Sequence, residues 1–278
     1  MTTKLLALDL DGTLLDPYGK LPATARDAVA DARRAGLLVV VCTGRRFRTA
    51  LPLLRELELT GFVVVNNGAV VKDLASGATL HSAYLEADVY PEALELMRAA
   101  GSPLVYIDDY ESGTDILMER GLPPHPFQAQ YLRDHGGQCR EVDDLGATAE
   151  QRVIMLSMMA DEGTLVPLRE EANRALAGRV QTHMIWNKNY EGHILEFFST
   201  RSGKWNALER VAAESGIQAS EIAAVGDDTN DVSMIRGAGL GIAMGNAVDE
   251  ARRAADQVVR SNAEGGVVEA IRRVLLTA

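Results

Sequence analysis

The chain has 278 residues, of which 47% are hydrophobic and 24% charged, and its formal net charge is -11 at pH 7. This length and composition are sufficient to bury one large core or two modest ones. The negative charge repels polyanions, so we do not expect nonspecific nucleic-acid binding. A small anionic substrate would need local compensation by a metal, a lysine or backbone amides.

Membrane insertion and a disulfide framework are not expected either. No apolar run approaches the length of a membrane span, and the apolar residues before Asp9 are too few for a signal-peptide core. We therefore expect a cytoplasmic location. Cys42 and Cys139 lack the paired spacing of a zinc site or a disulfide framework, which predicts two plain thiols.

Short apolar runs alternate with helical patterns at both ends of the chain. From the N-terminus, we expect strands at residues 5–8, 37–41 and 62–65, and a helix at 22–35. In the C-terminal part, we expect helices at 204–215, 232–236 and about 267–276, and strands at 222–225 and 240–243. This alternation predicts an α/β fold with a doubly wound, Rossmann-like parallel sheet.

The regular alternation of apolar runs and helical patterns changes between roughly Tyr84 and Tyr190. There we expect helices at 87–100 and 165–177, and strands near 104–107 and 153–158. Because no acidic cluster follows a buried strand in this segment, we interpret residues 84–190 as a separate α+β domain inserted into the first. Residues 1–83 and 191–278 would then fold together as one discontinuous core.

Two carboxylates follow the first predicted strand, in the run Asp9-Leu10-Asp11-Gly12-Thr13. Ligands bind at the carboxyl ends of strands in open α/β sheets, so these carboxylates lie where a site is expected. An ordinary turn also favours Asp and Gly, but it would not require the apolar Leu14 and Leu15 that follow at once. We therefore interpret Asp9 and Asp11 as functional.

A second acidic run, Gly226-Asp227-Asp228-Thr229-Asn230-Asp231, follows another predicted strand. An acidic loop can simply cap a helix, but Asp227 also occupies the carboxyl end of a strand. Magnesium takes hard oxygen ligands in octahedral geometry and keeps several waters, so two carboxylates and a backbone carbonyl suffice from the protein. Asp9 and Asp227 fit that role.

Two weaker signals suggest a bound anion. Thr43-Gly44-Arg45 ends the second strand shortly before a helix expected from about Phe47, and a hydroxyl with unpaired amides there can hold a phosphate. Lys204 begins a predicted helix, where a cation is unfavourable unless an anion lies nearby. Each has a structural alternative, namely a helix cap for Thr43 and a solvated side chain for Lys204.

In chain order, Asp-x-Asp, Thr-Gly-Arg, a lysine and Gly-Asp-Asp-x-Asn-Asp resemble the four motifs of the haloacid dehalogenase superfamily. The insert between Asn66-Asn67-Gly68-Ala69 and Lys204 is similar to the cap of its Cof-type (subclass IIB) sugar-phosphate phosphatases, as is Leu195-Glu196. The resemblance covers essentially the whole chain, with specific motifs in the core. It implies a magnesium-dependent phosphatase that acts on small phosphorylated metabolites.

The resemblance also implies a role for each motif residue. Asp9 would attack phosphorus to form an aspartyl-phosphate, and Asp11 would protonate the leaving alcohol and later activate water. Asp9, Asp227 and the backbone carbonyl of Asp11 would hold Mg²⁺. Asp231 would orient Lys204 or the waters of the metal. The groups that would hold the phosphoryl oxygens are Thr43, the amides of Leu10 and Gly44, Lys204 and Asn230.

Two residues depart from the usual lysine motif of the subfamily. Trp205 follows Lys204 where glycine is common, and Arg201 stands where a small residue is usual. The amine of the motif is still present. How closely a substrate can approach this helix start is left open by the sequence.

Three other functions fit parts of the sequence. A phosphomutase would use the same aspartyl chemistry, and only product analysis separates it from a phosphatase. A metal-bound binding protein without turnover is disfavoured, because all the expected catalytic side chains are present. A dinucleotide-binding oxidoreductase needs its glycine fingerprint after a strand, whereas Gly237-Ala238-Gly239-Leu240-Gly241-Ile242 precedes a strand and ends in isoleucine.

The insert contains a candidate recognition cluster near its end. His183, Trp186, Asn187 and Tyr190 combine polar and aromatic groups suited to contacting a sugar or a ring. Packing of Trp186 and Tyr190 within the insert explains the same residues equally well. A hinged cap would exclude water from the reaction, so we expect specificity to reside mostly in the insert. The sequence indicates neither the physiological substrate nor the oligomeric state.

Overall fold

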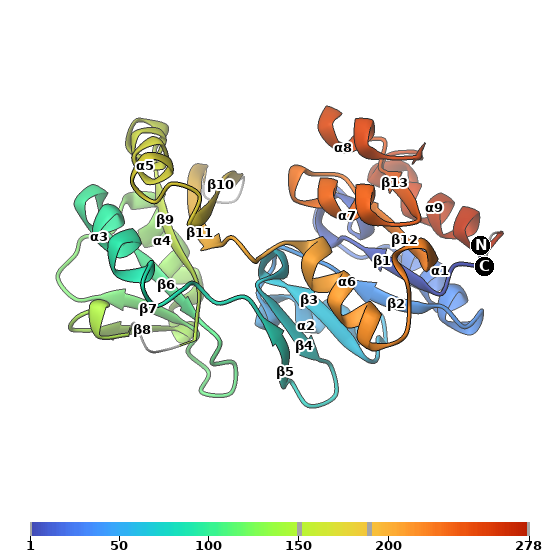
Figure 1. Cartoon of the computed structure of the whole chain (residues 1–278), viewed down its shortest axis with the longest axis horizontal. Helices are drawn as coiled ribbons and strands as arrows, with labels where there is room; N and C mark the ends of the chain where they lie inside the picture. Colours follow the sequence, from blue (N-terminus) through green and yellow to red (C-terminus); the bar gives the residue numbers. More distant parts are fainter. Residues whose placement is uncertain (1, 149–151, 188–190, 277–278) are drawn as a thin grey trace. The chain divides into compact units, whose positions relative to one another are not determined.

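The computed structural model describes residues 2–148, 152–187 and 191–276. The chain divides into two compact units (Figure 1). We call Met1–Ser82 with Gly203–Ala278 the core unit, and Ala83–Ser202 the cap unit. The core unit is therefore discontinuous in sequence.

A parallel sheet forms the centre of the core unit, with the strand order β14-β13-β12-β1-β2. Its strands are β1 (Leu5–Leu8), β2 (Leu38–Val41), β12 (Ile222–Gly226), β13 (Leu240–Ala243) and β14 (Gln257–Val258). Every residue of β1 is buried, as expected for a central strand that is covered on both faces. The predicted doubly wound α/β fold is thus confirmed.

Helices cover both faces of this sheet (Figure 1). They are α1 (Ala23–Arg34), α2 (Phe47–Glu56), α6 (Lys204–Glu214), α7 (Val232–Gly237), α8 (Asp249–Ala254) and α9 (Gly266–Leu275). Leu5 and Ala7 of β1 share a hydrophobic cluster with Leu208 and Val211 of α6. Because side chains alternate along a strand, the residues between them point to the opposite face, where α1 and α9 pack together.

The third expected strand, β3 (Phe62–Val65), belongs mainly to a small antiparallel sheet with β4 (Val70–Asp73) and β5 (Thr79–Ser82). A parallel bridge between Cys42 and Val64 connects it to the end of β2. Between β3 and β4, Asn66 and Asn67 adopt left-handed backbone conformations and reverse the chain. This turn brings Asn67 next to the carboxyl end of β2.

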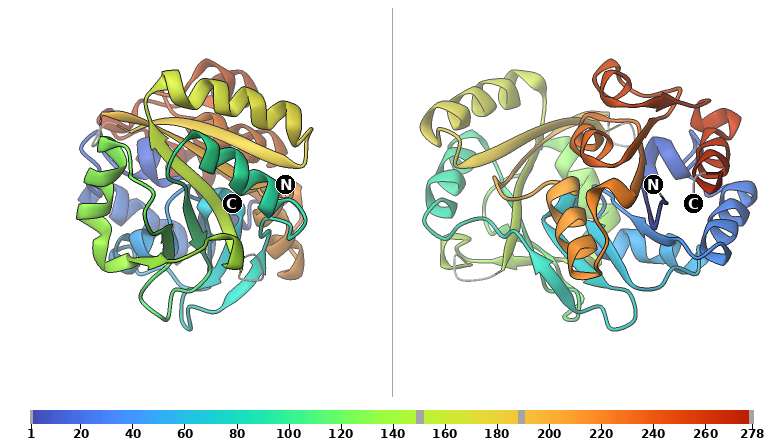
Figure 2. Two further views of the ribbon diagram at one scale, coloured as in Figure 1. Left: turned by 90° about the vertical axis from the view of Figure 1, so that its left-hand side faces the viewer. Right: turned by 45° about the vertical axis from the view of Figure 1, so that its right-hand side comes forward.

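The cap unit contains a six-stranded sheet with the order β10-β11-β9-β6-β7-β8. The strands are β6 (Leu104–Ile107), β7 (Ile116–Glu119), β8 (Cys139–Val142), β9 (Val153–Ala160), β10 (Val180–Asn187) and β11 (Gly192–Ser199). Helices α3 (Tyr90–Ala100) and α5 (Glu162–Ala175) pack together against the sheet (Figure 2), with Leu94, Leu165 and Phe197 in their common core. Helix α4 (Pro126–His135) binds β9 through Gln128, which accepts the Met159 N–H at 3.1 Å.

The return to the core unit differs from the expected boundary at residue 191. Strand β11 pairs with β10 along its whole length and also with β9, so it is part of the cap sheet. The compact division places the return at Gly203. Strands β10 and β11 were not predicted, because their mixture of polar and apolar residues gives no continuous apolar run.

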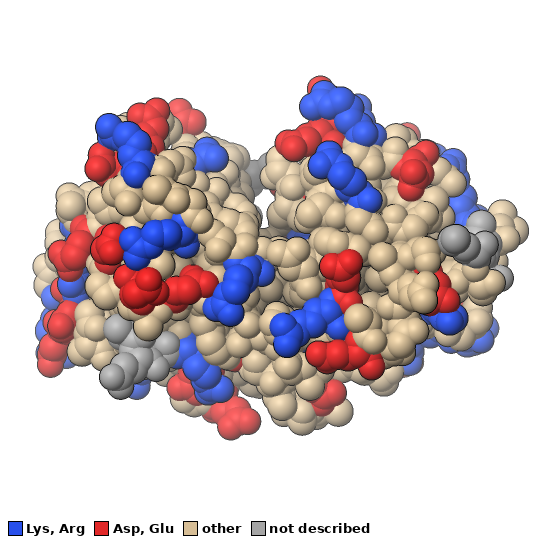
Figure 3. Space-filling view, in the orientation of Figure 1, with Lys and Arg blue, Asp and Glu red and all other residues tan. Residues whose placement is uncertain are grey.

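Surface features of the described residues agree with the composition. None of the helices in residues 2–148, 152–187 and 191–276 is long and apolar enough to cross a membrane. On the face drawn in Figure 3, basic and acidic side chains are intermingled over both units. Cys42 is buried and Cys139 is half-buried, and both are thiols outside any disulfide, as predicted.

Candidate active site

The loop after β1 presents both of its aspartates at the carboxyl edge of the sheet. Asp9 follows β1 directly and is 4% exposed, whereas Asp11 is exposed. Gly12, which follows Asp11 directly, has a φ of +83°, a backbone conformation that favours glycine. A Cβ atom at Gly12 would lie 2.1 Å from Oδ2 of Asp227. Glycine is therefore required both by the turn and by the close approach of a carboxylate.

Lys204 lies at the first position of α6 and connects two carboxylates. Its Nζ is 2.7 Å from Oδ1 of Asp9 and 2.7 Å from Oδ1 of Asp231, and the side chain is 1% exposed. Burial lowers the pKa of Lys204, but Asp231 and Asp9 outweigh it and hold the pKa above its ordinary value. The lysine is thus a buried, permanently charged ammonium group, and the solvated-side-chain alternative does not apply.

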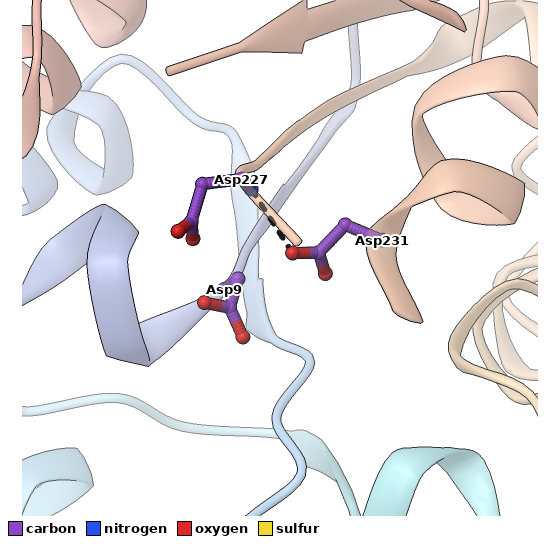
Figure 4. A group of neighbouring side chains, drawn as sticks. All are labelled: Asp9, Asp227 and Asp231. Carbon is purple, nitrogen blue, oxygen red and sulfur yellow. Dashed lines mark hydrogen bonds between the residues drawn. The ribbon is translucent and has the colours of Figure 1, made fainter. Parts of the chain in front are cut away.

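Asp227 and Asp231 reach the site from the loop after β12 but have different partners (Figure 4). Oδ2 of Asp231 accepts the backbone N–H groups of Asp227 at 3.0 Å and Asp228 at 3.1 Å. With Lys204 on its other oxygen, Asp231 is already bound by protein donors on both sides. Asp227 accepts side-chain donors, among them the hydroxyl of Thr13 on Oδ1 at 2.9 Å.

The site carries more negative than positive charge. One oxygen from each of Asp9, Asp227 and Asp231 lies within 4.8 Å of the other two, opposite the single ammonium group of Lys204. Burial raises the pKa of Asp9 well above its usual range. The charge of Lys204 lowers this pKa, whereas the neighbouring carboxylates of Asp231 and Asp227 raise it further. Burial and Asp231 likewise raise the pKa of Asp227 to about 7. This excess of buried oxygen ligands and negative charge fits a hard divalent cation.

The phosphate-binding residues predicted after β2 lie beside this cluster. The Thr43 side chain is fully buried, and its Oγ1 accepts the backbone N–H of Arg45 at 3.1 Å. Asn230 does not stand free, because its Nδ2 donates to Oδ1 of Asn67 at 2.8 Å. A Cβ atom on Gly44 would lie 2.9 Å from the same Asn67 oxygen. Asn67 thus links the two loops; in the sequence it stood out only as part of the run Asn66-Asn67-Gly68-Ala69 that precedes the insert.

Arg45 binds Asp11, the second aspartate of the first motif, in a contact that was not predicted from the sequence. Its Nε is 2.7 Å from Oδ2 of Asp11, and one terminal nitrogen is 2.6 Å from Oδ1. This bidentate geometry is typical of strong Arg–carboxylate pairs. The hydrogen bond to Asp11 raises the pKa of Arg45. Both residues belong to the core unit, so the pair connects the loops after β1 and β2.

The two departures at the lysine motif have structural explanations. Arg201 belongs to the cap unit, where its Nε donates to Oε1 of Glu86 at 3.0 Å and a terminal nitrogen donates to the carbonyl of Tyr84 at 3.2 Å. Trp205 packs on α7, since a Cβ atom on Gly237 would lie 2.3 Å from its ring. Arg201 thus forms hydrogen bonds within the cap unit, and Trp205 packs within the core unit.

The candidate recognition residues of the cap do not form one cluster. His183, Trp186 and Asn187 all lie on β10, but alternation places Trp186 on the opposite face from the other two. The Trp186 ring makes an edge contact with His193, with centroids 4.8 Å apart, and Tyr190 lies outside the described residues. Glu196 pairs directly with His183, and burial raises the pKa of this carboxyl to about 7.

Comparison with known proteins agrees with the sequence resemblance. The chain is 28% identical to the 5-amino-6-(5-phospho-D-ribitylamino)uracil phosphatase YwtE of Bacillus subtilis, with 98% of each chain covered. It is also 28% identical to the pyridoxal phosphate phosphatase YbhA of Escherichia coli, again over 98% of each chain. A haloacid dehalogenase-like hydrolase from Bacteroides thetaiotaomicron superposes with a TM-score of 0.82 at 29% identity, covering 98% of this chain and 100% of that one. The family model of haloacid dehalogenase-like hydrolases matches residues 6–271, and the chain therefore belongs to this family.

Proposed function

We propose that this protein is a magnesium-dependent phosphatase that hydrolyses phosphomonoesters of small metabolites. The observation that carries the proposal is the buried Lys204, which bridges Asp9 and Asp231 beside Asp227. Such a cluster combines a positioned carboxylate nucleophile with the positive charge that phosphoryl transfer needs. The names of the relatives, which are phosphatases of two different metabolites, point the same way.

The first half of the reaction uses the two aspartates of the β1 loop. A carboxylate oxygen of Asp9 forms a bond to phosphorus while the ester P–O bond breaks, which gives an aspartyl-phosphate. Asp11 donates a proton to the departing alcohol oxygen. Because Arg45 holds both oxygens of Asp11, this pair has to open at least on one side before the proton can move.

The second half returns the enzyme to its starting state. Asp11 now removes a proton from a water whose oxygen attacks phosphorus, and the acyl-phosphate bond breaks to release inorganic phosphate and the Asp9 carboxylate. Lys204 and Thr43 would hold the equatorial oxygens through both steps. Asp9, Asp227 and the carbonyl of Asp11 would bind Mg²⁺, which supplies charge neutralisation for the phosphoryl group and the carboxylates. Asp231 keeps Lys204 in place.

Release of inorganic phosphate tests the activity directly. Purified protein is incubated with a panel of phosphomonoesters in the presence of Mg²⁺ or of a chelator, and the alcohol product is identified by mass spectrometry. We expect Mg²⁺-dependent release and no product with a relocated phosphoryl group, which would instead indicate a mutase. Asp9→Asn should abolish turnover while circular dichroism stays unchanged. Near-normal turnover of this variant would exclude Asp9 as the nucleophile.

The cap unit is proposed to select the substrate. His183, Asn187 and Glu196 share one face of the β10–β11 pair, and this face presents polar groups suited to a hydroxyl-bearing leaving group. His183→Ala and Asn187→Ala should change the relative rates among organic phosphates while hydrolysis of a minimal aryl phosphate stays similar. Trp186→Ala, on the other face, is the matched control. A uniform loss over the whole panel would contradict recognition by this face.

A further inference from the structure

Asn246 connects two loops of the proposed metal site, although it belongs to none of the motifs found in the sequence. It follows β13 in the turn that leads to α8. Its Nδ2 donates to the carbonyl of Gly12 at 2.9 Å and to Oδ2 of Asp227 at 3.1 Å. A side-chain amide has two N–H hydrogens, so one is available for each acceptor. The residue thus joins the β1 loop to the β12 loop.

The orientation of the Asn246 amide is determined by a third contact. Its Oδ1 accepts the backbone N–H of Asn262 at 2.9 Å. A backbone N–H can only donate, so the oxygen of the amide must face Asn262 and its nitrogen must face the site. The Asn262 side chain in turn donates to the carbonyl of Leu15 at 2.9 Å. Two carbonyls of the β1 loop, those of Gly12 and Leu15, are therefore held by asparagines from the C-terminal part of the chain.

The support behind Asn246 is itself tightly constrained. The N–H of the preceding Gly245 donates to the carbonyl of Arg260 at 3.1 Å, and a Cβ atom on Gly245 would lie 2.6 Å from the backbone nitrogen of Ser261. Ser261 also forms a reciprocal cap with Glu264. The amide is thus presented by a backbone that has little freedom to move.

Both oxygens of the Asp227 carboxylate are held by side-chain donors. Thr13 donates to Oδ1 at 2.9 Å and Asn246 donates to Oδ2 at 3.1 Å, and together they fix the plane of the carboxylate. Each oxygen keeps a further lone pair for a cation.

We propose that Asn246 is a positioning residue for Mg²⁺ binding. It holds the Asp227 carboxylate and, through the carbonyl of Gly12, the β1 loop in the arrangement that the metal needs. The inference rests on the metal site of the proposed function and extends it to a residue outside the four motifs. Groups that orient metal ligands typically change metal affinity by about 10- to 100-fold when they are removed. The effect should therefore appear in binding, before any turnover.

The test measures Mg²⁺ binding by isothermal titration calorimetry in the absence of substrate. For Asn246→Ala we expect the Kd for Mg²⁺ to rise about 10- to 100-fold, with kcat largely restored at saturating Mg²⁺. Asn246→Gln retains an amide but displaces it by one methylene, so the same direction of change is expected if the alanine variant does not fold. Asn173→Ala, an exposed asparagine of the cap unit, is the control and should bind as wild type.

Three results would overturn the inference: an unchanged Kd for Mg²⁺ in both Asn246 variants, a loss of kcat that saturating Mg²⁺ does not restore, or an equal change in the Asn173 control. Failure of the proposed function looks different, because wild-type protein would then neither bind Mg²⁺ nor release phosphate. If the wild type binds Mg²⁺ and releases phosphate, and the Asn246 variants match it, only the positioning role of Asn246 is refuted.

Discussion

Replacing Gly12 by alanine should damage the proposed metal site far more than an equivalent replacement elsewhere. The new Cβ would lie 2.1 Å from Oδ2 and 2.6 Å from Cγ of Asp227, so the carboxylate would have to rotate away from Thr13 and Asn246. Losing two hydrogen bonds to a charged group costs about 1.5–3 kcal/mol each before relaxation. The left-handed backbone adds about 1 kcal/mol for a residue with a Cβ atom.

Gly19 provides the matched control for this experiment. Its φ is +74°, close to the +83° of Gly12, but a Cβ atom there would meet nothing within 4 Å. Gly19→Ala should therefore lose only the backbone contribution of about 1 kcal/mol, with Mg²⁺ affinity unchanged. Gly12→Ala should lose up to about 3–6 kcal/mol more in urea denaturation and bind Mg²⁺ at least about 10-fold more weakly by calorimetry. Equal losses of stability and of Mg²⁺ affinity in the two variants would refute the argument that a Cβ atom at position 12 displaces the Asp227 carboxylate.

Three further predictions concern the charged groups. Asp11→Asn should keep Mg²⁺ affinity but lose about 10²- to 10⁴-fold in kcat, with alkyl phosphates affected more than an aryl phosphate in single-turnover assays; complete loss of metal binding would contradict the assignment. The raised pKa of Asp227, about 7 in the folded chain, means that stability from this group is fully present below its unfolded pKa of about 4 and is lost as the pH rises through 7. Between pH 4 and 8, the free energy of unfolding of the metal-free protein should therefore fall by up to about 4 kcal/mol relative to Asp227→Asn. Mg²⁺ should restore this stability. Parallel plots of unfolding free energy against pH for the two proteins would count against this prediction. Lys204→Met should leave the charge of Asp9 uncompensated and lower the free energy of unfolding by about 3–5 kcal/mol at pH 8, and by less at pH 6. Unfolding curves of the variant that match those of the wild type at both pH values would disprove the role of the buried charge.

The core strands were predictable because parallel strands that are buried on both faces need continuous apolar runs. The strand expected at residues 5–8 is observed at Leu5–Leu8, and that expected at 240–243 at Leu240–Ala243. The carboxylates at the ends of β1 and β12 were found for a related reason, since charged residues directly after such runs are conspicuous. The observed proximity of Asp9 and Asp227 follows from the adjacent pairing of β1 and β12.

Contacts that depend on how loops approach each other were not predictable from spacing. Arg45 and Asp11 belong to different loops, and neither residue type indicates its partner in advance. Asn246 follows a predicted strand, but an asparagine in a turn is ordinary, and only the fold brings its amide to Asp227. The cap strands β10 and β11 were missed because their polar and apolar residues are mixed, which also misplaced the domain boundary.

The position of the cap unit within the chain has a consequence for biosynthesis. β1 precedes the cap unit in the chain and leaves the ribosome before it, yet its neighbour β12 begins only at Ile222, after the whole cap unit has been made. A nascent chain that ends near residue 202 therefore contains every strand of the cap sheet but lacks three of the five strands of the core sheet. Since domains generally fold as units during synthesis, the cap unit should become protease-resistant on stalled ribosomes while Asp9 still lacks its partners. The catalytic centre would therefore assemble only after the cap unit has been made.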